Sequence, residues 1–108
     1  MAAVRELARG RLPTQFGEFD IVSFEGLSGP LNDVALVRGD VGANAIIPVR
    51  LHSECLTGDA LGSLRCDCGE QLAEALRRLA DQERGVLLYM RQEGRGIGIA
   101  NKVRAYEL

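Results

Sequence analysis

Residues 68–89 read CGEQLAEALRRLADQERGVLLY, and the rest of the chain can be interpreted outward from them. The apolar residues of this stretch recur at helical spacing, at Leu72, Ala75, Leu76 and Leu79. Arginines and acidic residues occupy the other face. This pattern predicts an amphipathic helix that begins at Cys68 and ends near Gly85. The apolar run Val86–Tyr89 then predicts a short buried strand. A helix followed at once by a buried strand predicts a sheet with helices packed on it.

The sequence before Cys68 has the pattern of strands and turns. Four segments predict strands: Val4–Leu12, Glu18–Glu25, Asp33–Arg38 and Ile46–His52. The turn-forming residues 13–17, PTQFG, predict a hairpin between the first two. After the buried strand, a glycine-rich turn leads to a second predicted helix from Ile99 to Glu107. We therefore predict one α/β domain of the α+β kind over residues 1–108, with a mainly antiparallel sheet formed by the N-terminal strands.

Composition narrows the classes of function. The chain has 108 residues, of which 46% are hydrophobic and 26% charged, as in an ordinary globular domain. It contains no apolar run long enough to span a bilayer and no secretory signal at its start, so we expect a cytoplasmic protein without a membrane role. A net charge of -2 argues against nucleic acid as a partner. The last predicted helix is cut short at Leu108, and we expect further chain to follow it.

The three cysteines of the chain, Cys55, Cys66 and Cys68, form a C-x10-C-x-C pattern. An odd number of cysteines in one short window, without signs of export, favours metal binding or catalysis over a disulfide. Thiolates are good zinc ligands, and the nearby glycines allow the loop to turn around an ion. Three protein ligands leave one tetrahedral position open, which is typical of catalytic zinc. The pattern thus predicts a zinc-binding loop between a strand and a helix.

Two alternatives to a catalytic zinc remain open. His52, three residues before Cys55, could complete a Cys3His site that only staples the loop. Alternatively, the cysteines could be small buried hydrophobic residues. Arg65, beside Cys66, could offset part of the thiolate charge, or it could be an ordinary solvated arginine.

Residues 91–98, RQEGRGIG, follow the predicted strand and precede the second predicted helix. Glycines and a helix N-terminus suit phosphate oxygens, although neither the P-loop order nor G-x-G-x-x-G is present. A flexible turn with solvated arginines is the alternative. Several cations around this segment could face a polyphosphate: Arg50, Arg91, Arg95, Lys102 and Arg104. The carboxylate of Glu93 could accept hydrogen bonds from the N1–H and exocyclic amine of a guanine base, so a guanine nucleotide would find partners at both of its ends.

Taken together, these motifs resemble those of the GTP cyclohydrolase II family. The resemblance rests on three segments, Val49–Gly69, Arg91–Gly98 and Asn101–Tyr106, and residues 12–19 resemble the family's opening hairpin. It implies a homodimeric enzyme of riboflavin synthesis that opens the imidazole ring of GTP at C8. The products would be formate, pyrophosphate and a diaminopyrimidinone ribosyl phosphate. Zn²⁺ would be the catalytic metal, and Mg²⁺ would assist at the triphosphate.

The resemblance also implies roles for individual residues. Cys55, Cys66 and Cys68 would be the zinc ligands, and Tyr106 would lie near the attacking water, unless it is only an amphipathic helix residue. The substrate site would be lined by Arg50, Leu51, His52, Ser53, Glu54, Gln71, Glu93, Gly94 and Arg95. Family members continue into a segment with further substrate-binding and triphosphate residues, which this sequence does not contain. Two alternative functions are a relative that stops at a formylated intermediate and a noncatalytic zinc-stapled nucleotide-binding module.

Overall fold

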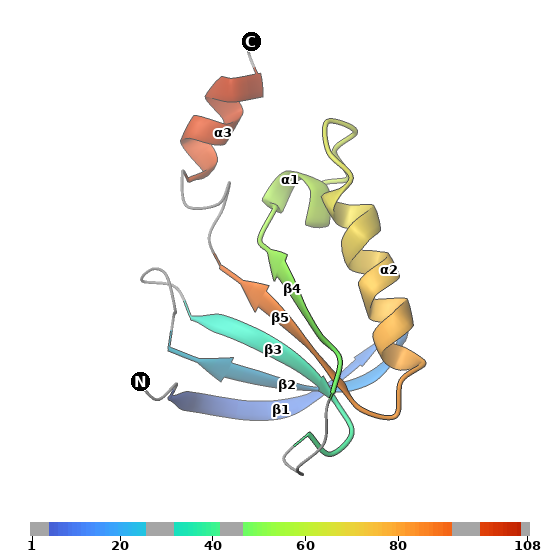
Figure 1. The fold of residues 1–108 in the computed structure, drawn as a ribbon. Coiled ribbons are helices and arrows are strands. Elements are labelled where there is room, and N and C mark those ends of the chain that lie inside the picture. Colours follow the sequence, from blue (N-terminus) through green and yellow to red (C-terminus); the bar gives the residue numbers. More distant parts are fainter. Residues whose placement is uncertain (1–4, 26–31, 42–46, 92–97, 107–108) are drawn as a thin grey trace.

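The computed structural model describes residues 5–25, 32–41, 47–91 and 98–106, and these form an α+β fold (Figure 1). The predicted fold class, with a mainly antiparallel sheet and helices beside it, is confirmed. In chain order the elements are β1 (Glu6–Thr14), β2 (Gly17–Phe24), β3 (Asp33–Arg38), β4 (Val49–Ser53), α1 (Leu56–Asp59), α2 (Cys68–Ala80), β5 (Gly85–Met90) and α3 (Ile99–Tyr106).

The five strands lie in the order β1-β2-β3-β5-β4. Neighbouring strands are antiparallel except β4 and β5, which are parallel. A parallel pair needs a long connection that returns the chain to the same end of the sheet, and here α1 and α2 form it. The carboxyl ends of β4 and β5 therefore lie side by side, at the edge of the sheet where α1 begins (Figure 1).

The core lies between α2 and one face of the sheet. Leu79 and Ala75 of α2 pack with strand residues Phe19, Leu36 and Leu87, each of which is at most 9% exposed. Residues of opposite parity form a second buried cluster on the other face: Val22, Phe24, Ala35 and Val37. This cluster belongs to β2 and β3, which lie inside the sheet. β5 pairs with β3, and α2 packs on the opposite face of the same strands.

The predicted elements differ from the observed ones mainly at their ends. The helix was predicted to end near Gly85 but ends at Ala80, because its apolar periodicity stops at Leu79 and the polar residues 81–83 are exposed. The predicted hairpin is confirmed with a tighter turn, in which the Thr14 hydroxyl accepts from the Phe16 amide. The fourth strand begins at Val49, whereas Ile46 lies outside the described residues.

Two further features were not predicted. The four-residue helix α1 is too short to show a period, and it contains a glycine. The parallel pairing of β4 with β5 depends on the long connection and has no local signature. Within the described residues, the helices lack the length and apolar character that crossing a membrane requires.

Candidate metal centre

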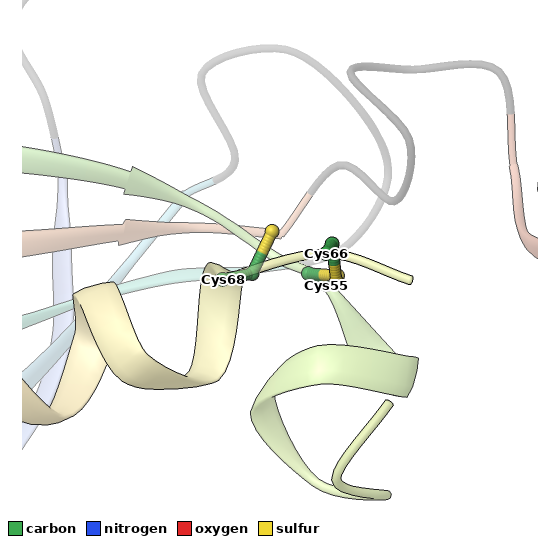
Figure 2. A group of neighbouring side chains, drawn as sticks. All are labelled: Cys55, Cys66 and Cys68. Carbon is green, nitrogen blue, oxygen red and sulfur yellow. The ribbon is translucent and has the colours of Figure 1, made fainter. Parts of the chain in front are cut away.

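The three cysteine side chains converge at the start of two helices (Figure 2). Cys55 directly precedes α1, Cys66 lies in the connection, and Cys68 is the first residue of α2. Their Sγ atoms lie within 4.8 Å of one another, and those of Cys55 and Cys66 are 3.6 Å apart. The predicted cysteine cluster is thus present, between a strand and a helix as expected.

Glycines make this convergence possible. A Cβ atom on Gly58 would lie 2.8 Å from Cys66 Sγ and 3.2 Å from Cys55 Sγ. A Cβ atom on Gly69 would overlap the carbonyl oxygen of Gly58. The first turns of α1 and α2 can therefore touch only because both positions lack side chains, and their contact brings the three thiols together.

The cluster fits a zinc ion. Three thiolates at tetrahedral angles and at zinc–sulfur bonds of about 2.3 Å stand about 3.8 Å apart, close to the observed spacing. Among the described residues, the group contains no further histidine, cysteine or carboxylate. A tetrahedral ion held by these three sulfurs would keep one position open toward a water or a substrate.

The side chain of Lys102, from α3, contacts the cysteine cluster. Its ammonium donates a hydrogen bond to Cys55 Sγ at 2.7 Å. Burial pushes the pKa of Cys55 upward, but the hydrogen bonds from Lys102 and neighbouring groups outweigh it and lower that pKa to about 7. Burial, together with the hydrogen bonds and charges of Cys55 and Cys66, raises the pKa of Cys68 to about 12. One thiol of the metal-free cluster is thus ready to ionise and another strongly holds its proton.

The His52 side chain is paired with Asp59. Its Nε2 lies 3.1 Å from both carboxylate oxygens, and the two side chains are 7% and 6% exposed. Tyr89 stacks on the imidazole and donates its hydroxyl proton to Asp59 at 2.6 Å. Neither ring nitrogen of His52 joins the group of ligand atoms within 4.8 Å of one another, which among the described residues holds the three cysteines, and this speaks against the stapled-loop alternative.

A cavity of about 320 Å³ opens beside the cysteines at the end of β4. It is lined by Leu51, His52, Ser53, Glu54, Cys55, Cys68, Gln71 and Lys102. Five of these are expected substrate residues, so the fold brings most of that set next to the thiols. Lys102 was expected only as one of several cations. No sequence signal placed it at Cys55, because the two residues are 47 positions apart.

Arg50 and Glu54 are two further expected site residues with defined surroundings. Arg50 lines a neighbouring cavity of about 240 Å³ between β4 and α2, together with Arg78 and Leu79. Glu54 accepts from Arg91 at 2.8 Å, an ion pair that joins the carboxyl ends of β4 and β5. Glu93, Gly94 and Arg95 lie outside the described residues.

Tyr106 reaches the metal loop from the end of α3. Its hydroxyl is 2.9 Å from the Thr57 hydroxyl, which is 3.7 Å from Cys55 Sγ. Arg65 lies over the Tyr106 ring, 5.0 Å from its centroid, and Lys102 is the cation that contacts Cys55. Arg65 therefore contacts the tyrosine, in a role that the sequence did not predict. Asp59 and Thr57 were also missed, because their contacts with Tyr89 and Tyr106 join residues 30 and 49 positions apart.

Comparison with known proteins now adds to this geometry. The family described as GTP cyclohydrolase II matches residues 5–108, almost the whole sequence. The chain belongs to the GTP cyclohydrolase II family. GTP cyclohydrolase-2 of Hahella chejuensis is 56% identical over 106 residues, which cover 98% of this chain and 51% of that protein. GTP cyclohydrolase-2 of Escherichia coli O9:H4 is 54% identical, over 97% of this chain and 54% of that protein.

This GTP cyclohydrolase II family chain spans about half the length of the curated relatives that it matches. A solved structure supports the fold alone. It is that of RibBX, a two-domain 3,4-dihydroxy-2-butanone 4-phosphate synthase from A. baumannii, with a TM-score of 0.51 and 18% identity. That match covers 99% of this chain and 28% of the synthase. The family assignment therefore rests on the sequence matches.

Proposed function

We propose that the protein containing this chain is a zinc-dependent GTP cyclohydrolase II, which opens the guanine imidazole ring of GTP and releases formate. One observation carries the proposal: two of the three converging cysteines, Cys55 and Cys68, line a cavity together with five residues that the family resemblance assigns to the substrate. The cavity, at about 320 Å³, is at the small end of ligand pockets, which suits a base better than a whole nucleotide. The guanine would lie in the cavity and the triphosphate would extend out of it.

One group of residues would hold the metal, and another would hold the guanine base. Cys55, Cys66 and Cys68 would bind zinc, which when bound supplies a Lewis acid with an open coordination position. Ser53 and Gln71 would orient the base through their polar groups, since both line the cavity. The ammonium of Lys102 would offset part of the negative charge of three thiolates.

Tyr106 would contribute its hydroxyl at the rim of the metal loop. Its hydrogen bond with Thr57 holds that hydroxyl on the Cys55 side of α1. A phenol in this position can orient a water by hydrogen bonding without forming a covalent bond. The homodimer and the Mg²⁺ at the triphosphate stay predictions from the family resemblance, and the cytoplasmic location stays a prediction from the amino-acid sequence.

Formate release tests the proposal directly. The full-length protein, incubated with GTP and Zn²⁺, should release formate and pyrophosphate, and the product mass should show loss of the formyl carbon. Cys66→Ser should lose both the bound metal and the activity. Leu64→Ala, which changes a fully exposed residue of the same loop, should retain both. Formate release that persists after complete removal of the metal would overturn the proposal, and a product that keeps its formyl group would favour the incomplete reaction.

A further inference from the structure

We propose that Asp59 is a positioning residue for the metal centre: its carboxylate fixes the backbone of Cys55 and so the direction of the first thiol ligand. This inference rests on the proposed function, because it takes the cysteines as the metal ligands. It concerns a residue to which neither the sequence motifs nor the cavity lining gave a role of its own.

The contacts of Asp59 lead to this role. Its Oδ2 accepts hydrogen bonds from the backbone amide of Cys55 at 3.0 Å and from the Tyr89 hydroxyl at 2.6 Å. His52 Nε2 lies 3.1 Å from both oxygens. In the tautomer that carries its proton on Nε2, the imidazole donates to this carboxylate. Three donors thus point at one carboxylate.

Burial makes this arrangement specific. The Asp59 side chain is 6% exposed, and a buried carboxylate is costly unless several donors satisfy it. The three donors come from three elements: His52 from β4, Tyr89 from β5, and the Cys55 amide from the start of α1. The carboxylate therefore ties the beginning of α1 to the carboxyl ends of the parallel strands.

The Cys55 amide is the contact that matters for the metal. Cys55 is the N-cap of α1, with extended dihedral angles, and its own side chain makes no capping hydrogen bond. Asp59 reaches back from the first turn to the N-cap amide, as the acidic residue of a capping box does. Because the cysteine side chain is short, fixing this backbone fixes where Sγ can lie. Cys66 Sγ approaches the same turn over Gly58.

Metal titration with matched variants tests the role. The full-length protein should be titrated with Zn²⁺ against a chromophoric chelator and with Co²⁺ by absorption spectroscopy. Asp59→Asn places an amide NH2 group among the three donors, and we expect about 10- to 100-fold weaker binding of both metals. The thiolate-to-Co²⁺ bands should also change at saturation, because the sulfur geometry changes.

Tyr89→Phe is the matched control for stability. It removes one donor from Asp59 but keeps the hydrogen bond to the Cys55 amide, so it should lower the melting temperature while the Co²⁺ dissociation constant stays within about 3-fold. Glu74→Gln, on the exposed face of α2, should change neither. If Asp59→Asn does not fold, Asp59→Glu displaces the oxygens by one methylene and should show the same weakening.

The outcomes separate this inference from the proposed function. Tight metal binding by the parent protein, with equal affinity and equal Co²⁺ bands in the folded Asp59 variant, would overturn the positioning role alone. Equal weakening in Tyr89→Phe would also overturn it, because the loss would then follow stability. A parent protein that binds no metal through the three thiols would refute the proposed function itself.

Discussion

The Lys102 ammonium lies 2.7 Å from Cys55 Sγ, and we predict that its charge strengthens metal binding by the cysteines. Lys102→Met removes the ammonium, so the pKa of Cys55 should rise and its thiolate should be less populated at neutral pH. We expect about 10-fold weaker Zn²⁺ binding at pH 7. Arg104→Met, which removes an exposed cation of the same helix, is the control and should bind as the parent does. Equal loss in the two variants would show that only the overall charge matters.

The two shifted thiols predict how metal affinity depends on pH. Zinc binds thiolates, so binding must release the protons that the metal-free thiols hold. Cys68, with its pKa raised to about 12, is protonated throughout the physiological range, whereas Cys55 is protonated only below about pH 7. Affinity should therefore fall as pH falls, with at least one proton released above pH 7 and at least two below it.

Calorimetry in buffers of different ionisation enthalpy measures this proton release. A proton count that stays constant through pH 7 would contradict the lowered pKa of Cys55. In Lys102→Met the pH at which the number of released protons changes should be higher, because the ammonium that stabilises the Cys55 thiolate is gone.

The cysteine cluster could be predicted from sequence because the spacing and odd number of the cysteines are visible in it. The partners of those cysteines could not. Lys102 reaches Cys55 across 47 positions, and Tyr89 reaches Asp59 across 30, so both contacts depend on the fold. Arg65 was one candidate for offsetting the thiolate charge, since it adjoins Cys66 in sequence, but it stacks on Tyr106. Adjacency in sequence was a poor guide to contact in this loop.

The contact between α1 and α2 predicts the effect of a single methyl group. Gly69→Ala would press a Cβ atom into the Gly58 carbonyl oxygen, so one helix must shift. We expect a net loss of about 1–3 kcal/mol in the free energy of unfolding, although alanine is the better helix former. Urea denaturation measures it. Gly10→Ala, whose Cβ would meet no atom within 4 Å, is the control. Equal stability of the two variants would mean that the helices do not touch in solution.

The longer elements could be predicted because their signals are local. The helical spacing of Leu72 to Leu79 predicted α2, and alternation in β2 and β3 predicted strands. The end of α2 was wrong by about one turn, since polar residues continue a helix or a loop equally well. The helix α1 was missed because four residues show no period, and the contacts of Asp59 with Tyr89 and His52 hold it against the strands.

Packing predicts which parts of the molecule open first. Strand β3 is central to the sheet and mostly buried, whereas α3 has no buried residue. The contacts of α3 with the rest of the chain include Lys102 with Cys55, and Tyr106 with Thr57 and Arg65. Amides of α3 should therefore exchange with solvent far faster than those of β3. Native-state hydrogen exchange measures this, and equal protection of the two elements would contradict it.

The parallel pairing of β4 and β5 has a consequence for how the chain folds. These strands can join only after residues 54–84 have closed into a loop, and closing a long loop slows folding. All three cysteines lie inside that loop, so an ion that gathers them shortens the segment left to close. We expect refolding from urea to be faster with Zn²⁺ present, as stopped-flow fluorescence or circular dichroism would show; equal rates would mean that the strands pair before the thiols meet. The cysteines would then govern the order of assembly as well as the chemistry of the finished site.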